Sequence, residues 1–245
     1  MFSLYKKELS GFFSSLVGLI TIVIFLLING LLLWILDTDF NILKFGFSQM
    51  DGLFLLSPFA FLFLIPAITM RMFAEERKNG TIEMLLTKPI TDFGIIFSKF
   101  SAAITLVLFS LLPTLIYYVS IYYLAEPVGN IDSGAIFGSY IGLFFLGATF
   151  VSIGIFSSSL TSNQIVAFII ALSISLFMYL GFETIYLLDL FGKVDLFIKG
   201  LGINHHYSSI SRGIIDSRDI LYFISVITLF LALTYILLQS RKWKK

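Results

Sequence analysis

Cysteine is absent from this 245-residue sequence, so a disulfide framework, a thiolate metal site and a catalytic thiol are all excluded. Charged residues are also scarce, at 13% of the chain, whereas 58% of the residues are hydrophobic and the mean hydropathy is +0.98. A soluble protein needs a polar exterior, and one core of this size cannot enclose so much apolar surface. We therefore expect most of the chain to lie in lipid, with no room for a separate soluble catalytic domain of roughly 100 residues.

A nucleotide-binding loop is missing as well. Phosphate binding of the P-loop kind needs a glycine-rich loop that ends in Gly-Lys followed by Ser or Thr. The sequence has one Gly-Lys pair, Gly192-Lys193, and Val194 follows it. We therefore expect nucleotide hydrolysis in another subunit, and no cofactor or metal bound by this chain. Nor is there a basic patch for a nucleic acid, apart from the tail at residues 241–245, which we interpret as an anchor to acidic lipid.

Six stretches of the sequence are apolar and long enough to cross a bilayer, which takes about 20 residues in a helix. They lie at approximately residues 16–36, 53–70, 95–124, 135–160, 165–188 and 220–238. We therefore expect an all-α integral membrane protein with a single transmembrane domain over residues 1–245. The first stretch is too long for the apolar part of a signal peptide and lacks a small-residue cleavage site, so we interpret it as a retained helix.

Two residue types indicate local features within these helices. Proline has no N–H group to donate, so Pro113 is expected to kink the third helix, and Pro58 and Pro66 to kink the second. In the fourth helix, Gly138 and Gly142 are spaced so that another element can approach the backbone closely. Packing inside the bundle is favoured here over a contact between subunits.

The distribution of lysine and arginine predicts the orientation in the membrane. Six crossings place both termini on one side, which would hold eleven basic residues: Lys6, Lys7, Arg71, Arg77, Lys78, Lys88, Lys99, Arg241, Lys242, Lys244 and Lys245. The other side would hold five: Lys44, Lys193, Lys199, Arg212 and Arg218. Because the more basic side of a membrane protein stays in the cytoplasm, we expect both termini to be cytoplasmic.

A charged interval at residues 71–94 separates the second helix from the third. It begins with a short charged helix, and Asn79-Gly80 predicts the end of this helix, because glycine is common just past a helix C-terminus. Thr81 would then begin another helical turn before Pro89. The interval is therefore expected to form a cytoplasmic pair of short helices.

Three motifs in the sequence resemble ABC-2 type transporter permeases. The segment FAEERKNGTIEMLLTKPITDFGIIFSKF at residues 73–100 is similar to the family signature between helices two and three. SSSLTSNQIVAF at residues 157–168 resembles the turn between helices four and five, and ISRGIIDSRDILYF at residues 210–223 resembles the entry to the last helix. Together with the opening LYKKEL, these motifs follow the order of the family over nearly the whole chain. Within the family, the sequence is most similar to membrane subunits of gliding-motility-associated transporters.

The resemblance implies a permease subunit of a bacterial inner membrane. It implies a second permease subunit, identical or related, and two cytoplasmic ATPase subunits that hold ATP and Mg²⁺ and drive the export of a surface component. It also implies a coupling set that docks on the ATPase: Glu75, Glu76, Arg77, Gly80, Thr81, Glu83, Leu85 and Leu86. On the charges alone, the alternative that these residues only solvate a loop would be favoured.

A second segment of interest, at residues 189–218, is expected on the exterior side. Ile203, Tyr207, Ile210 and Ile214 recur at spacings of three and four residues. This pattern predicts one apolar face of a short helix that lies in the membrane interface or re-enters the membrane. The resemblance implies that this region caps the outer end of the transport pathway, as an exterior gate.

Four polar residues are candidates for binding or for a pathway. His205 and His206 are adjacent, so they point in different directions from a helix, and neither has an acidic residue one turn away. We interpret them as an interfacial polar pair rather than a metal site. Asn29 and Glu183 lie within expected helices, where polar side chains often line a pathway. Alternatively, Asn29 bonds a neighbouring helix and Glu183 reaches water at the outer end of the fifth helix.

Two other function classes remain open. A membrane-embedded enzyme would need a convergent catalytic set such as Ser-His-Asp, and the two histidines of the chain are the adjacent pair. A self-sufficient channel would need a pore-lining ring or a filter loop, and no such repeat is visible in the sequence. Co-purification of an ATPase in equal copy number would favour the permease, whereas transport by the chain alone in liposomes would favour the other two classes.

Overall fold

The computed structural model describes residues 1–44, 49–86, 90–189 and 192–240. The secondary structure in these ranges is helical, without a strand. Six helical spans are long and apolar enough to cross a membrane: Leu16–Ile35, Asp51–Lys78, Asp92–Leu124, Ser133–Leu160, Gln164–Leu187 and Ser217–Ser240. The all-α class and the six spans expected from the sequence are therefore confirmed. The second span is longer than expected because the charged helix after it continues from its end.

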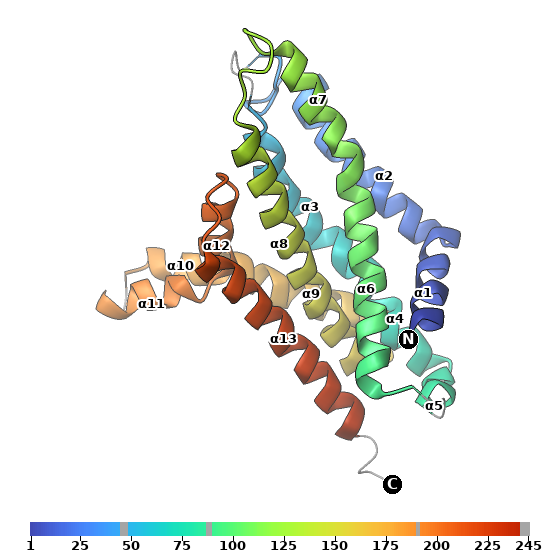
Figure 1. The fold of residues 1–245 in the computed structure, drawn as a ribbon. Coiled ribbons are helices and arrows are strands. Elements are labelled where there is room, and N and C mark those ends of the chain that lie inside the picture. The colour runs from blue at the N-terminus through green and yellow to red at the C-terminus, as the bar shows by residue number, and fades with distance from the viewer. Residues whose placement is uncertain (45–48, 87–89, 190–191, 241–245) are drawn as a thin grey trace.

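Several spans are built from more than one helix (Figure 1). In chain order the helices are α1 (Phe2–Ser14), α2 (Leu16–Gly30), η1 (Leu31–Ile35), α3 (Asp51–Thr69), α4 (Arg71–Lys78), α5 (Thr81–Leu86), α6 (Asp92–Leu111), η2 (Leu112–Thr114), α7 (Leu115–Leu124), α8 (Ser133–Leu160), α9 (Gln164–Leu176), η3 (Phe177–Gly181), α10 (Phe182–Leu187), η4 (Gly192–Val194), α11 (Asp195–Gly200), α12 (Ile203–Ile210) and α13 (Ser217–Ser240). The N-terminus and the end of α13 lie at the same end of the bundle as α4 and α5 (Figure 1).

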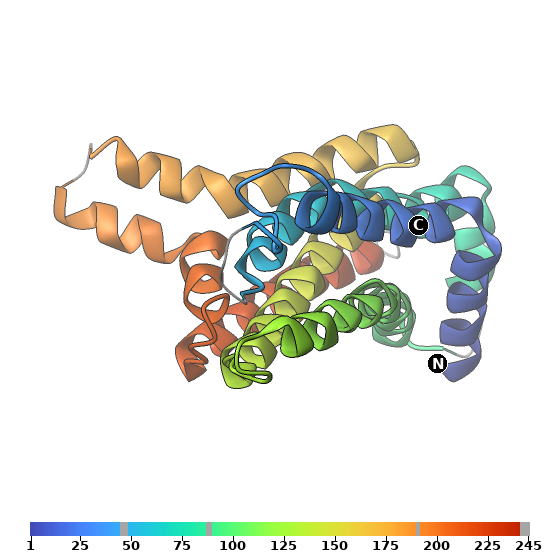
Figure 2. The same ribbon diagram turned by 90° about the horizontal axis from the view of Figure 1, so that it is seen from above.

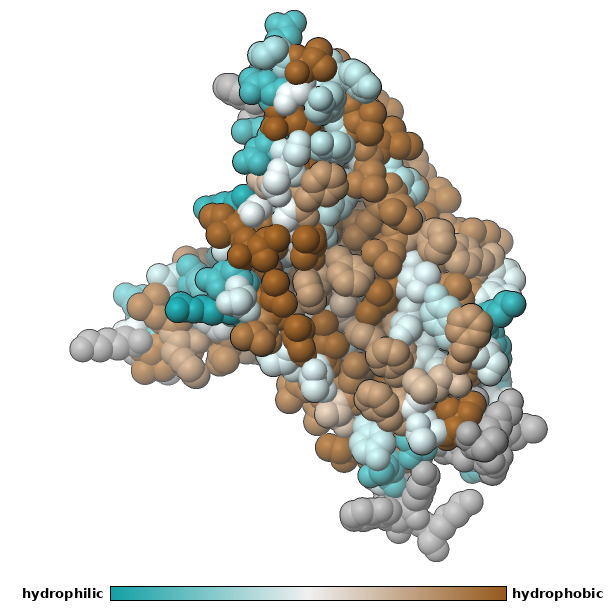
Figure 3. Space-filling view, viewed as in Figure 1, coloured by the Kyte–Doolittle hydropathy of each residue, from teal (hydrophilic) through white to brown (hydrophobic). Residues whose placement is uncertain are grey.

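Helix α8 is the centre of the bundle. In its most apolar window 78% of the residues are buried, against 22% in the windows of the spans at Gln164–Leu187 and Ser217–Ser240. It packs against α3, α4, α6, α9, α12 and α13. Apolar side chains cover much of the middle of the bundle, and polar ones gather towards its ends and around α11 and α12 (Figure 3). The outer helices therefore present apolar side chains that suit a lipid environment.

Glycines let two elements approach α8 closely. A Cβ atom at Gly154 would lie 2.0 Å from Thr69 Oγ1, at the end of α3, and one at Gly142 would lie 2.5 Å from Ile210 Cγ2, in α12. A Cβ at Gly138 would meet the backbone of Gly213, just after α12. The close approach expected at Gly138 and Gly142 is thus confirmed as packing inside the subunit. Its partner is the segment at residues 189–218, which we call the exterior segment after its expected side, rather than another membrane span.

The prolines differ in their local effects. Pro113 lies in the 3₁₀ turn η2, which interrupts the third span where a kink was expected. Helix α3 remains helical through Pro58 and Pro66. Pro58 has no N–H to donate to the Phe54 carbonyl four residues earlier, and the Tyr207 hydroxyl donates to that carbonyl instead, at 2.7 Å. The exterior segment thus satisfies an acceptor that the proline leaves without a donor in its own helix.

We expect Gly154→Ala to destabilise the bundle, because the added methyl group would overlap Thr69 and push α3 away from α8. Overpacking of this kind costs about 1–3 kcal/mol. The thermal unfolding midpoint of the purified protein in detergent measures the effect. Gly134→Ala is the control in the same helix, since its added Cβ would lie 3.4 Å from Asp132 Oδ1, an ordinary contact distance. Equal midpoints for the two variants would contradict a close approach at Gly154.

Candidate functional site

The charged interval after the second span forms two short helices. Helix α4 ends at Lys78 with Asn79 as its C-cap, and Gly80 has a φ of 69°, a left-handed conformation that favours glycine. Helix α5 begins at Thr81. The helix end at Asn79-Gly80 and the new turn at Thr81 are therefore confirmed. Parts of the motif lie outside the described residues, namely the side chains of Leu85 and Leu86 and the whole of residues 87–89, which include Pro89.

A serine of α8 caps the start of α4. The Ser158 hydroxyl accepts hydrogen bonds from the Phe73 N–H at 3.0 Å and from the Ala74 N–H at 3.1 Å. It donates to the Met70 carbonyl, at the junction of α3 and α4, at 2.9 Å. The first N–H groups of a helix have no acceptor within it, so a buried helix start needs a partner from elsewhere. Ser158, which is fully buried, is that partner and ties α4 to the central helix.

The ammonium group of Lys99 is buried between three helices. Lys99 belongs to α6, and its side chain is 1% exposed. Its Nζ lies 3.0 Å from Glu8 Oε1 of α1 and 2.9 Å from Glu76 Oε1 of α4, and it donates to the Met72 carbonyl at 2.8 Å. The three N–H donors of the ammonium thus have three acceptors. A buried charge requires such partners because desolvation is costly, so this contact joins α1 and α4 to α6.

The structure divides the expected coupling set between two faces of α4 and α5. Glu76 points to Lys99, and its side chain is 14% exposed, whereas Glu75 and Glu83 are exposed. Gly80 and Thr81 are exposed as well. An open cleft of about 490 Å³ lies between this segment and the turn from α8 to α9, and it is lined by Arg77, Gly80, Ile82, Glu83, Leu160, Thr161 and Ser162. The two segments that carry separate sequence motifs therefore meet in one cleft.

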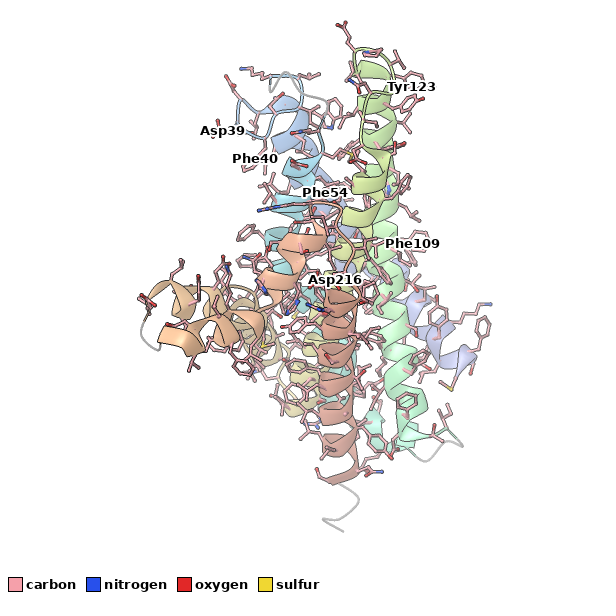
Figure 4. All side chains as sticks on the ribbon, turned by 60° about the vertical axis from the view of Figure 1, so that its left-hand side comes forward. Asp39, Phe40, Phe54, Phe109, Tyr123 and Asp216 are labelled. Carbon is pink, nitrogen blue, oxygen red and sulfur yellow. The ribbon has the colours of Figure 1, made fainter. Side chains whose placement is uncertain are left out.

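Helix α12 in the exterior segment has the expected apolar face. Ile203, Tyr207 and Ile210 are buried. Burial raises the pKa of the Tyr207 hydroxyl well above its ordinary value, so it remains a hydrogen-bond donor. The expectation for Ile214 was wrong: it lies beyond the end of α12 and is 62% exposed, because the chain turns at Gly213, where φ is 82°. Figure 4 shows α12 between Phe54 of α3 and Asp216 before α13.

The two histidines have different surroundings. His205 is exposed, whereas His206 is partly buried and stacks on Tyr222 with 3.9 Å between the ring centroids. His206 Nδ1 lies 2.7 Å from Asp219 Oδ1, and its Nε2 lies 2.9 Å from the Gly200 carbonyl. Asp219 could not be identified from helical spacing, since it lies 13 residues from His206 and belongs to a different helix. Among the described residues, no group of three His, Asp or Glu side chains is arranged to hold a metal ion.

The two candidate pathway residues both have protein partners. Asn29 is fully buried; its Nδ2 donates to the Phe25 carbonyl at 2.8 Å, and its Oδ1 accepts from the Ser57 hydroxyl of α3 at 3.3 Å. It therefore links α2 to α3, which is the alternative that the sequence left open. Glu183 of α10 accepts a hydrogen bond from the Asn204 amide of α12. A pathway role for either residue stays a prediction.

Comparison with known protein families identifies a family for this chain. A protein-family model described as ABC-2 family transporter protein matches residues 2–243, which is nearly the whole chain. No curated protein matches the chain. The family match covers both the charged interval and the exterior segment, so both parts of the candidate site lie within the matched region.

We expect Lys99→Met to destabilise the protein strongly, since Glu8 and Glu76 would lose the cation that they share. Removing one partner of a buried ion pair costs about 3–5 kcal/mol. Membrane abundance and the unfolding midpoint measure the loss, with Lys78→Met on the exposed face of α4 as the control. Adding Glu8→Gln and Glu76→Gln to Lys99→Met should raise the midpoint again. A triple variant less stable than Lys99→Met alone would refute the ion-pair explanation.

We expect Ser158→Ala to loosen the start of α4, because two N–H groups and one carbonyl would lose their partner. Leaving such a buried group unpaired costs about 1–3 kcal/mol. Amide hydrogen exchange at Phe73 and Ala74 should therefore become faster. Ser157→Ala is the matched control, since the Ser157 hydroxyl bonds the Ile153 carbonyl of its own helix. Unchanged exchange at both amides in Ser158→Ala would show that the cap does not hold α4.

Proposed function

The chain belongs to the ABC-2 transporter family, and we propose that it is the membrane subunit of an exporter driven by separate cytoplasmic ATPase subunits. Members of this family are transport subunits rather than catalysts, and they work with ABC ATPase subunits and with other permease subunits. The proposed assembly has two permease subunits and two ATPase subunits, and the ATPases hold ATP and Mg²⁺. The absence of a P-loop from the sequence supports the assignment of ATP hydrolysis to separate subunits.

The cleft between α5 and the α8–α9 turn is the observation that carries the proposal. It brings Arg77, Gly80 and Glu83 of the charged interval together with Thr161 and Ser162 of the turn. It lies at the end of the bundle that also holds the N-terminus and the end of α13 (Figure 1). The excess of basic residues expected on that side supports its assignment to the cytoplasm. An ATPase element that enters this cleft would contact both motifs at once.

The contacts around α4 supply a route for coupling. In the proposed mechanism, ATP-driven closure of the two ATPase subunits moves α4 and α5. Ser158 passes this movement to α8, and Lys99 passes it to α6 and α1. Glu76 is therefore proposed to act inside the subunit, whereas Arg77 and Glu83 line the cleft and face the partner. Rigid helices joined by buried polar contacts can transmit such a shift across a membrane domain.

The exterior segment is proposed as the outer gate. Its residues Tyr207 and Ile210 pack against α3 and α8, so a movement of either helix would reach the segment directly. We further infer a narrower role from the sequence resemblance alone, as the permease of a gliding-motility-associated transporter in a bacterial inner membrane. The cargo in that role would be a surface component.

We expect Glu83→Lys to weaken the association with the ATPase, because Glu83 lines the proposed docking cleft. Reversing a charge in a desolvated contact costs several kcal/mol, whereas the same change on a solvated surface stays within about 0.5 kcal/mol. The measurement is the amount of ATPase that co-purifies with the tagged protein from its own cells in mild detergent. Glu126→Lys, in the exposed loop between α7 and α8 at the other end of the bundle, is the control.

Three results would contradict the proposal in different ways. Recovery of the ATPase at the wild-type level with Glu83→Lys would remove the docking role from this cleft. Vanadate-sensitive ATP hydrolysis by the purified chain alone would refute the separate ATPase. Transport by the chain alone in liposomes, without any ATPase, would instead favour a channel.

A further inference from the structure

A second cleft lies on the opposite side of α4, where α1, α4 and α6 meet. It has a volume of about 410 Å³, within the range of small-molecule sites. Its charged lining residues are Lys7, Arg71, Lys99, Glu8, Glu75 and Glu76. Three cations and three carboxylates balance at neutral pH, so the cleft carries both signs of charge without a net excess. A ligand with one positive and one negative group suits it better than a simple anion or cation.

Two polar atoms of this lining are buried without a hydrogen-bond partner among the described residues. They are Arg71 Nε, which is a donor, and Glu76 Oε2, which is an acceptor. The other carboxylate oxygen of Glu76 is already bonded to Lys99. A buried polar group that stays unpaired is costly, and more so when it is charged. The cleft therefore lacks one acceptor for Arg71 and one donor for Glu76, and a zwitterion whose cation carries N–H groups supplies both.

The chemistry of the charged side chains in the cleft narrows the class of ligand further. Arginine pairs with phosphate through parallel N–H···O bonds, and Lys7 adds a second cation on the same cleft. A primary ammonium has three N–H donors for Glu75 and Glu76, whereas a trimethylated ammonium has none. A phosphoethanolamine group therefore fits the lining, and phosphocholine would leave Glu76 Oε2 without a donor.

The position of the cleft indicates the source of that group. The lining includes Ser15, where α1 turns sharply into the first membrane span (Figure 2). From this point exposed apolar side chains continue along α2, beginning with Leu16, Leu19 and Val23. A head group in the cleft would place its acyl chains along this face. We propose that the cleft is a binding site for an ethanolamine phospholipid, with its phosphate at Arg71 and Lys7 and its ammonium at Glu75 and Glu76.

Binding to the purified full-length protein tests this site without any ATPase, so the result does not depend on the proposed function. The delipidated protein in detergent is titrated with phosphatidylethanolamine, phosphatidylcholine and phosphatidylglycerol of identical acyl chains, and bound lipid is counted by native mass spectrometry. We expect phosphatidylethanolamine to bind about tenfold more tightly than the other two, since phosphatidylcholine has no N–H donor for Glu76 and phosphatidylglycerol has no positive charge for the carboxylates.

Matched variants locate the binding. Arg71→Gln should weaken phosphatidylethanolamine binding about tenfold, whereas Lys78→Gln, on the same helix but outside the cleft, should not. Should Arg71→Gln fail to fold, Lys7→Gln with its exposed neighbour Lys6→Gln as control gives the same comparison. Glu75→Gln should reduce the preference for ethanolamine over choline, and Glu83→Gln, which lies outside this cleft, should keep it.

Three results would overturn the proposal. Equal binding of the three lipids would mean that the head group is not recognised. Tighter binding of phosphatidylglycerol would indicate a site for anions rather than for a zwitterion. Wild-type binding of phosphatidylethanolamine by both Arg71→Gln and Lys7→Gln would show that water, not lipid, satisfies the buried atoms.

Discussion

The ammonium of Lys99 is the contact on which one end of the bundle depends, because segments far apart in the sequence share it. Glu8 approaches from α1, and Glu76 and the Met72 carbonyl approach from α4. Neither carboxylate can leave without reducing the charge compensation of the buried ammonium, which is why breaking a buried pair is costly. The contact therefore fixes α1 and α4 relative to α6 and places the charged interval at a defined angle to the membrane spans.

A second set of contacts fixes the relative positions of the helices towards the other end of the molecule. Ser158 holds the start of α4 on α8, and the close approach of Gly154 to Thr69 holds the end of α3 on the same helix. At the far end, Tyr207 bonds the Phe54 carbonyl of α3, and Ile210 packs on Gly142 of α8. The second span, α8 and the exterior segment are thus packed together along their length. A rotation of α4 would therefore displace the exterior segment through these two helices.

Local features of the sequence predicted the spans and the helix end at Gly80, because hydropathy and backbone freedom depend on neighbouring residues. The contacts that organise the site could not be predicted in this way, since Ser158 is 85 residues from Phe73 and Glu8 is 91 residues from Lys99. One signal was available: Lys99 is a single charge near the start of an apolar span, and such a charge usually has a partner. Its partners, one of them the Glu76 that had been expected to face the ATPase, became identifiable only from the fold.

Helix α4 lies between the two clefts, and this position links the two proposals. Arg77 lines the cleft beside the α8–α9 turn, whereas Arg71, Glu75 and Glu76 line the cleft beside α1. An ATPase element in the first cleft and a lipid head group in the second would press on opposite faces of one eight-residue helix. If docking of the ATPase shifts α4, it changes the lipid affinity, and the lipid must then change the affinity for the ATPase by the same factor. The lipid composition of the membrane would therefore set how tightly the permease and the ATPase associate, without any contact between the lipid and the ATPase.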